Sequence, residues 1–266
     1  MSESPVLVVK IGGSTLGSHD TTLEDLVALQ GQGWRPLVVH GGGAAVSDWL
    51  KVYDTPTRFV RGLRVTDAAS LRVVVAVLAG LINKELVAAL NALGGRALGL
   101  SGADGGLIRV RTLDPELGYV GKIEQVDGDM LRGLMDEGYM PVIAPLGLRW
   151  QDEGPRDQIL NINADTVAGE VALALGARWL VFLTDVPGVA ASDGRSLGRI
   201  SAEEAAVLVE EGVVSGGMIP KVEACLRAAT GGTRTAVIDG RQPHALLAAL
   251  ERGELAGTII GPEEAQ

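Results

Sequence analysis

The chain has 266 residues, 47% of them hydrophobic, and its formal net charge is −10. This composition excludes a disordered protein, and the acidic balance excludes a general nucleic-acid surface. A single cysteine, the lack of a signal peptide and the lack of an apolar run approaching the ~18–20 residues of a membrane span together predict a cytoplasmic protein.

Short apolar runs alternate with helical stretches along the whole chain. The expected strands are Val6–Lys10, Pro36–His40, Arg96–Leu100, Met140–Pro145, Trp179–Thr184 and Thr235–Asp239. The expected helices are Thr22–Gln32, Ala44–Val52, Ala68–Leu93, Asp127–Glu137, Asn163–Leu175, Ala202–Glu210, Pro220–Ala229 and Pro243–Glu251. Nearly continuous apolar strands separated by helices predict an α/β fold with a mostly parallel sheet covered on both faces. Glycine-containing stretches at Arg58–Val65 and Gly106–Gln125 predict hairpins, and a weak domain boundary is expected near Ala177.

Glycines cluster where the first two strands end, which is where open α/β sheets bind ligands. Gly12 and Gly13 follow Lys10, and His40–Gly43 reads HGGG at the start of a helix. Glycine lets a backbone approach an anion closely, and a helix N-terminus presents free N–H groups to it. The alternatives are a tight turn with a solvated lysine and a flexible connection. His40 itself is expected to be a packed strand-end residue rather than a base.

A second lysine stands at a helix start. Gly216 and Gly217 precede Pro220, which is an ordinary first-turn residue, and Lys221 follows it directly. A cation is disfavoured at the positive end of a helix unless an anion is bound there. Lys221 is therefore a candidate site residue.

Three polar side chains crowd the start of the helix near residue 163. One of Asn163 and Asp165 could be an N-cap, and the remaining groups, including Asn161, are expected to face a ligand. Arg64 lies between two apolar residues and is expected to point inward, where a guanidinium binds a carboxylate in bidentate fashion. Arg58 and Arg61 are expected to lie on a solvated hairpin.

These residues offer cations and anion cradles but nothing that looks like a general base. The chain has three histidines, no metal-ligand cluster and no GxSxG motif. A carboxylate, already ionised at pH 7, is a nucleophile that needs no base. Phosphoryl transfer depends mostly on positioning and charge neutralisation. Two converging lysines would repel each other by about 4 kcal/mol at ~4 Å and an effective dielectric of ~20, and Asp165 between them would offset that.

Seven motifs in order make the chain resemble the amino-acid kinase family over essentially its whole length. They read VVKIGGS, VVHGGG, GLRVTD, GLSGADGG, LNINADTVA, LTDVPGV and GGMIPKV. The resemblance implies a three-layer αβα sandwich with a mostly parallel open central sheet, the carbamate-kinase-like fold. It implies an N-terminal lobe (1–177) for acyl-amino-acid binding and dimerisation, and a C-terminal lobe (178–266) for nucleotide binding.

The implied activity is a kinase that phosphorylates the γ-carboxylate of N-acetyl-L-glutamate with Mg·ATP, in arginine biosynthesis. By resemblance, Lys10 and Lys221 stabilise the transferring phosphoryl group and Asp165 organises them. The implied substrate-binding residues are Gly42, Gly43, Arg64, Asn161 and Asn163. The implied nucleotide- and phosphate-binding residues are Gly12, Gly13, Thr184, Asp185, Gly188, Gly217 and Met218. Mg²⁺ is expected to be held mainly by phosphates, with no protein ligand.

One position departs from the family pattern. Residue 61 is often acidic or amidic in the family, and here it is Arg61. The alternative acceptor is aminoadipate or glutamate attached to an acidic carrier protein, although that branch generally lacks GLRVTD. An alternative of another class is a non-catalytic nucleotide-binding regulatory module. It predicts loss of Lys10, Lys221 or Asp165, and all three are present.

The stretch Leu71–Ile82 is too apolar for a one-sided surface helix. Its cover is either the protein's own core or the same helix of a second subunit, related by a two-fold axis. We expect a homodimer that binds small molecules, with neither nucleic acid nor membrane as a partner.

Overall fold

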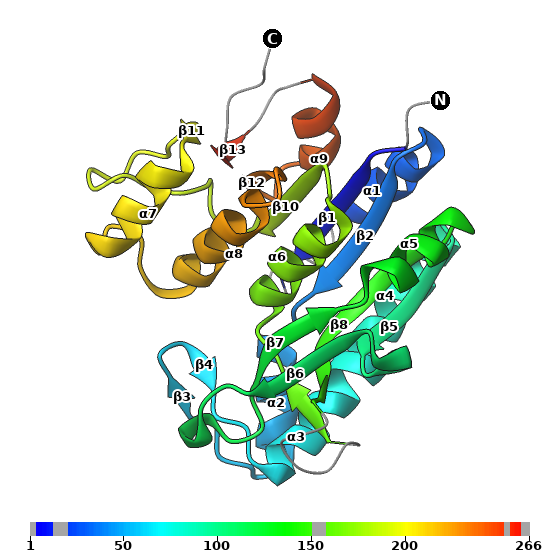
Figure 1. Ribbon diagram of the computed structural model, residues 1–266, viewed down its shortest axis with the longest axis vertical. Coiled ribbons are helices and arrows are strands. Elements are labelled where there is room, and N and C mark those ends of the chain that lie inside the picture. The colour runs from blue at the N-terminus through cyan, green and yellow to red at the C-terminus, as the bar shows by residue number, and fades with distance from the viewer. Residues whose placement is uncertain (1–3, 13–20, 151–157, 253–255, 262–266) are drawn as a thin grey trace.

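The computed structural model describes residues 4–12, 21–150, 158–252 and 256–261. These residues form one large twisted sheet with helices packed on both faces, and a small separate hairpin (Figure 1). The sheet has 11 strands in the order β11-β13-β12-β10-β1-β2-β8-β6-β7, and β5 and β9 also pair with β8. The predicted fold class, an αβα sandwich with a mostly parallel sheet, is confirmed.

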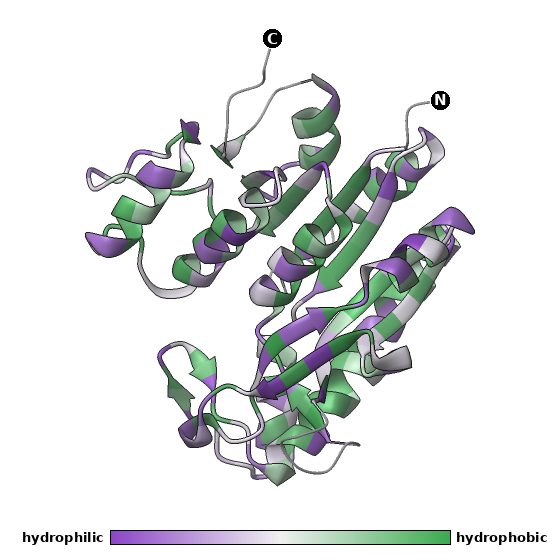
Figure 2. Cartoon of the chain, in the orientation of Figure 1, coloured by the Kyte–Doolittle hydropathy of each residue, from purple (hydrophilic) through white to green (hydrophobic). Residues whose placement is uncertain are grey.

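The strands of the sheet are short, and those at its centre are buried. Their bounds are β1 (Val6–Ile11), β2 (Arg35–His40), β5 (Ala97–Gly102), β6 (Ile108–Thr112), β7 (Gly121–Val126), β8 (Met140–Arg149), β9 (Ile159–Asn161), β10 (Trp179–Thr184), β11 (Arg199–Ile200), β12 (Arg234–Asp239) and β13 (Gly257–Ile260). The hairpin pairs β3 (Phe59–Val60) with β4 (Leu63–Arg64). Figure 2 shows the central strands as largely hydrophobic, whereas β6 and β7 alternate in polarity.

The centre of the sheet is parallel. β1 pairs in parallel with β2 on one side and with β10 on the other. Among the described strands of this sheet, the antiparallel pairs are β12–β13, β6–β7 and β8–β9. Because β1, β2 and β10 run in one direction, their carboxyl ends share one edge of the sheet, where the predicted site residues follow them.

Helices cover both faces of this sheet. Their bounds are α1 (Thr22–Gly31), α2 (Gly43–Val52), α3 (Ala68–Val75), the π-helical η1 (Ala76–Ile82), α4 (Asn83–Ala92), α5 (Gly128–Asp136), α6 (Ala164–Leu175), α7 (Ala202–Glu210), α8 (Ile219–Ala229), α9 (Ala245–Leu247) and the π-helical η5 (Ala248–Arg252). Val8 packs with α5, α6 and α8, while its neighbours Leu7 and Val9 pack with α1, α4 and α9. This alternation explains why the central strands read as continuous apolar runs.

The expected strands and helices are all present, with three differences. The expected helix Pro243–Glu251 is wrong at its start, because His244 adopts a left-handed conformation (φ 54°) and the helix begins after it. The strand expected to end at Pro145 continues to Arg149, where it pairs with β6 and β9. Strands β9, β11 and β13 were not predicted, because two to four residues leave too short a pattern to read.

The segments α3, η1 and α4 form one continuous helix, Ala68–Ala92. Its most apolar window of 18 residues has a mean hydropathy of 2.0, and 33% of that window is buried. By length and composition alone this helix could cross a membrane, but its uninterrupted apolar run, between Arg72 and Asn83, is shorter than a membrane span, as expected from the sequence. A core helix of a globular protein meets the same criterion.

Candidate active site

Two lysines from distant parts of the chain meet at one carboxylate. Lys10, in β1, places its Nζ atom 2.7 Å from Oδ1 of Asp165, and Lys221, in α8, places its Nζ atom 3.3 Å from Oδ2. The Asp165 side chain is 7% exposed and that of Lys10 is 9% exposed. Each oxygen of a buried carboxylate thus holds a different cation, which fixes the separation of the two lysines.

The start of α6 fixes the position of this carboxylate. Asn163 is the N-cap residue, and its Oδ1 accepts hydrogen bonds from the N–H groups of Asp165 (2.8 Å) and Thr166 (3.1 Å). The positive end of the helix favours a carboxylate in its first turn. Of the polar groups expected there, the oxygen of Asn163 is therefore the cap, and the Asp165 carboxylate is turned towards the lysines.

Lys221 stands in the first turn of α8, where a cation is unfavourable without a partner. Besides Asp165, its Nζ donates to the carbonyl oxygen of Gly217 at 3.0 Å. Its side chain is 19% exposed, about twice the value of Lys10. The structure thus supplies the compensating anion from α6.

A cavity of about 250 Å³ opens beside Lys10 and Asp165. It brings together all the predicted substrate-binding residues: Gly42, Gly43, Arg64, Asn161 and Asn163. The amide of Asn161, at the end of β9, donates to the Thr66 hydroxyl at 3.3 Å. The cavity is thus lined by two cationic side chains, Lys10 and Arg64, and by the amide groups of Asn161 and Asn163.

Arg64 is turned inward, as expected, and retains an unused donor. Its Nη2 donates to the carbonyl oxygen of Gly43 (2.9 Å) and to the hydroxyl of Ser47 (2.7 Å). Its Nη1 is buried and has no hydrogen-bond partner within the described part of the chain. Burial lowers the pKa of Arg64 from its usual value. Ser47 was not predicted, although its spacing of four from Gly43 places it on the same helix face.

Gly42 is required on two grounds. Its φ of 152° lies in the region that favours glycine. A Cβ atom there would lie 2.3 Å from Cδ1 of Ile82 and 2.7 Å from Cδ2 of Leu78. The HGGG stretch is therefore a specific backbone path at the start of α2.

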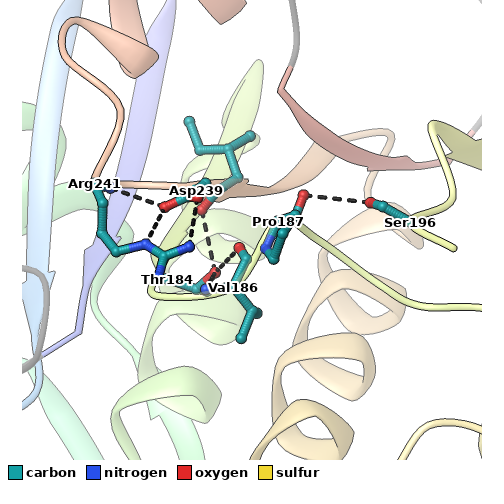
Figure 3. A network of polar contacts seen from close by, with 7 residues as sticks. Thr184, Val186, Pro187, Ser196, Asp239 and Arg241 are labelled. Carbon is teal, nitrogen blue, oxygen red and sulfur yellow. Dashed lines mark hydrogen bonds and ion pairs between the residues drawn. The ribbon is translucent and has the colours of Figure 1, made fainter. Parts of the chain in front are cut away.

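The described nucleotide-binding candidates do not line this cavity. Thr184 ends β10, and Asp185 and Gly188 follow it, beside the end of β12 (Figure 3). The Thr184 hydroxyl lies 2.9 Å from the carbonyl oxygen of Val186, so it shapes the turn that contains Asp185. Gly188 has φ 139°, and a Cβ there would lie 2.7 Å from Oγ1 of Thr258.

The other predicted phosphate-side residues lie at two places within the described ranges. Gly217 and Met218 form the short turn that precedes α8. Gly217 also lines a second cavity, of about 760 Å³, which runs along the starts of α6 and α8. Gly12 directly follows β1, while Gly13 lies outside the described residues.

An ion pair at the end of β12 was not predicted. Arg241 donates to both carboxylate oxygens of Asp239, at 2.8 and 2.7 Å (Figure 3). These hydrogen bonds lower the pKa of Asp239 and raise that of Arg241. Asp239 ends an apolar strand, a position that alone does not distinguish a ligand-facing carboxylate from one that closes a turn.

The hairpin arginines are exposed, as expected, and both have partners. Arg58 lies 3.8 Å from a carboxylate oxygen of Glu116, and Arg61 pairs with Asp114. Both acidic residues belong to the turn between β6 and β7. The unusual cation at position 61 is therefore neutralised by this chain's own Asp114.

No group of three or more histidine, cysteine, aspartate or glutamate side chains that could hold a metal ion occurs in the described ranges. At the site itself, both oxygens of Asp165 are occupied by lysines.

Comparisons with known proteins agree with this arrangement. The model of the amino acid kinase family matches residues 5–239. Acetylglutamate kinase of Dehalococcoides mccartyi is 46% identical over 262 residues, which cover 98% of this chain and 96% of that protein. The crystal structure of smu.665 from Streptococcus mutans superposes with a TM-score of 0.83 at 27% identity, covering 97% of this chain and 99% of that one. Carbamate kinase from Giardia lamblia shares the fold, with a TM-score of 0.69 at 15% identity over 99% and 100% of the two chains. The family model matches most of the chain, and the fold holds Lys10 and Lys221 at Asp165 beside the glycines of the HGGG stretch. The chain therefore belongs to the amino acid kinase family.

Proposed function

We propose that this chain transfers the γ-phosphoryl group of ATP to the γ-carboxylate of N-acetyl-L-glutamate, giving N-acetyl-L-glutamyl 5-phosphate. The observation that carries the proposal is the Lys10–Asp165–Lys221 cluster beside a cavity of about 250 Å³. The high identity to relatives named acetylglutamate kinase supports the choice of acceptor. This reaction belongs to arginine biosynthesis.

The acceptor carboxylate is ionised at neutral pH and attacks phosphorus without a general base. Lys10 and Lys221 offset the negative charge of the transferring group, and Asp165 holds them apart at the distance that the group requires. His40 does not serve as a base, because burial lowers its pKa to about 4 and both of its ring nitrogens have internal partners.

The acceptor is held by the other groups that line the cavity. The free Nη1 of Arg64 donates a hydrogen bond to the α-carboxylate. A hydrogen bond between a guanidinium and a carboxylate is charge-assisted and therefore among the strongest that this donor can form. The amide of Asn161 and the Nδ2 group of Asn163 bind polar atoms of the substrate. The backbone N–H groups of Gly42 and Gly43 approach the carboxylate that is phosphorylated.

ATP binds along the carboxyl ends of β10 and β12 in this proposal, with its phosphates near Lys10 and Lys221. The residues proposed to contact it are Gly12, Gly13, Thr184, Asp185, Gly188, Gly217 and Met218. In this proposal residues 178–266 bind most of the nucleotide, and residues 1–177 bind the acceptor and also contribute Lys10, Gly12 and Gly13 to the phosphates. Mg²⁺ enters with the nucleotide, because the described residues offer it no cluster of acidic ligands.

A second copy of the chain is the proposed cover for the long helix Ala68–Ala92. Only 33% of its most apolar window is buried within the chain, and Leu81 is 38% exposed. A two-fold interface would place the same helix of both subunits in contact. Light scattering is expected to give twice the mass of the 27.6 kDa chain. The mass of a monomer or of a hexamer would contradict this arrangement.

The activity is tested by mixing the protein with Mg·ATP and N-acetyl-L-glutamate. Release of ADP is measured, and the acyl phosphate is trapped with hydroxylamine as a hydroxamate. Parallel reactions contain free aminoadipate, free glutamate and a carrier-linked acceptor, and the Lys10→Ala variant is the blank. Activity with N-acetyl-L-glutamate alone supports the proposal. Activity with the carrier-linked acceptor alone, or ADP release without hydroxamate, contradicts it.

A further inference from the structure

A buried histidine and a buried asparagine lie beside Gly41–Gly43, the glycine loop at the start of α2. His40 is 1% exposed and Asn83 is 0% exposed. Nε2 of His40 lies 3.2 Å from Nδ2 of Asn83, and its Nδ1 lies 2.8 Å from the carbonyl oxygen of Gly41. Neither side chain lines the cavity, so neither contacts the acceptor directly.

The partners of Asn83 decide which histidine nitrogen carries the proton. Oδ1 of Asn83 accepts from Nζ of Lys84 at 3.0 Å, and an ammonium group can only donate. The amide nitrogen therefore faces the carbonyl oxygen of Val142 (2.9 Å) and the histidine ring. Because Asn83 donates to it, Nε2 of His40 must be the acceptor. The ring proton is then on Nδ1, from which it donates to the Gly41 carbonyl.

This hydrogen bond sets the direction of the next peptide group. In a planar trans peptide the C=O and N–H groups point in opposite directions. With its carbonyl oxygen held by His40, the Gly41–Gly42 peptide directs the Gly42 N–H away from the histidine. This N–H has no hydrogen-bond partner among residues 4–12, 21–150, 158–252 and 256–261. Gly42 lines the cavity at the N-terminus of α2, where an anion is favoured.

The π-helical segment η1 brings Asn83 to this position. Asn83 directly follows η1, and π-helical turns are rare and concentrate at functional sites. The facing strand leaves space for it, because a Cβ at Gly99 in β5 would lie 2.1 Å from Oδ1 of Asn83. Leu78 and Ile82 of the same segment fill the space beside Gly42. The continuous helix Ala68–Ala92 thus determines both the hydrogen bonds and the packing of the glycine loop.

We propose that Asn83 is a positioning residue for the reaction: acting through His40, it fixes the Gly41 carbonyl and directs the Gly42 N–H at the anionic group bound in the cavity. The inference rests on the proposed function for the identity of that anion. His40 acts as a neutral ring, because burial, together with the nearby charges of Lys10 and Lys84, lowers its pKa.

Kinetics of two variants test the inference against a matched control. Asn83→Leu replaces the amide with an apolar group of the same branched shape, and Asn83→Asp replaces the N–H donor with a carboxylate, which only accepts hydrogen bonds when it is ionised. Either is expected to lower kcat/KM for the acceptor by about 10- to 100-fold, since a misplaced donor costs that order of rate, with KM for ATP changed by less than about two-fold. The control is Asn91→Leu, which also removes hydrogen bonds between α4 and β5 but at the far end of that strand. It is expected to lower Tm and leave the kinetic constants unchanged.

A second readout needs no substrate. In ¹⁵N-histidine-labelled protein at pH 7, His40 is expected to be protonated on Nδ1 alone, and Asn83→Leu is expected to give a mixture of tautomers. A wild-type His40 protonated on Nε2 would overturn the inference, as would Asn83 variants with the kinetics of Asn91→Leu. The expected tautomer in a protein that does not phosphorylate N-acetyl-L-glutamate would overturn the proposed function, while supporting the assigned hydrogen bonds.

Discussion

Two carboxylates at the same edge of the sheet are equally buried and differently used. The side chains of Asp165 and Asp239 are each 7% exposed. The partners of Asp165 are lysines 9% and 19% exposed, from β1 and α8. The partner of Asp239 is Arg241, two residues further along the chain and 56% exposed. One carboxylate therefore joins three elements, whereas the other closes a local turn.

The difference shows that the burial of an acidic group does not by itself indicate its function. Without Asp165, two lysines would face each other at close range in a largely buried site, and breaking a buried ion pair typically costs about 3–5 kcal/mol. Without Asp239, Arg241 would turn into the solvent, where the loss of an exposed ion pair costs about 0–1 kcal/mol. Substitutions of the two carboxylates and of the neighbouring cations test this contrast.

Asp165→Asn is expected to have the largest effect of the series. An amide cannot compensate two positive charges, so the lysines separate and the site loses its geometry. We expect kcat to fall by at least about 10³-fold and the urea midpoint to fall as well. Steady-state kinetics and unfolding measured by circular dichroism are the tests. An Asp165→Asn protein as active and as stable as Asp239→Asn would abolish the contrast.

Replacing either lysine removes a cation but leaves its neighbour paired with Asp165. Lys10→Ala and Lys221→Ala are each expected to lower kcat by about 10²–10³-fold, with a smaller effect on acceptor binding. Single-turnover assays with measured acceptor affinity separate these effects. Near-normal kcat in one variant would show that its lysine does not contact the transferring group.

Arg64→Ala tests the acceptor end of the cavity. Loss of the guanidinium is expected to raise KM for N-acetyl-L-glutamate by roughly ten-fold or more, the usual order for a charged hydrogen bond, and to leave KM for ATP nearly unchanged. Equal changes in both constants would indicate a misfolded protein or a different acceptor site. Arg58→Ala, on the same hairpin and exposed, is the control.

The smallest effect is expected at Asp239, and it depends on pH. Its pKa is lower in the folded chain than its ordinary value near 3.8, so its ionised form stabilises the fold above that pH. This contribution is lost as the pH falls through the lowered pKa. Asp239→Asn should therefore be less stable than wild type at pH 7, and the difference should shrink below about pH 4. Urea unfolding at several pH values measures it, and a difference that grows on acidification would contradict the assignment.

The fold was predictable because central strands buried on both faces leave a plain signature. Val6–Ile11 and Trp179–Thr184 are apolar without interruption apart from Lys10 and the terminal Thr184. That uninterrupted pattern made Lys10 conspicuous. Lys221 was conspicuous for its electrostatics, as a cation at the wrong end of a helix. Each lysine is unfavourable in its local setting, and the carboxylate that compensates its charge, Asp165, lies in a different element of the chain.

Other features depend on contacts that no local pattern records. Asn83 is one polar residue after a long apolar stretch, and only the packing of α4 on β5 and β8 places its amide beside His40. The role of Asn163 was ambiguous for the same reason, since an N-cap and a ligand have the same side chain. The pair Asp239–Arg241 is formed by turn geometry at the end of β12, which the sequence alone does not specify.

The position of β1 has a consequence for how the protein is made. Its neighbour β2 follows closely in the chain, but its other neighbour, β10, comes after most of the chain. A ribosome would therefore release β1 long before the strand that completes its pairing exists. Parallel pairing between such distant segments is slow, because a long loop must close first. Lys10 stands on that half-paired strand, so the growing chain cannot assemble its reactive centre until α6, β10 and α8 have emerged.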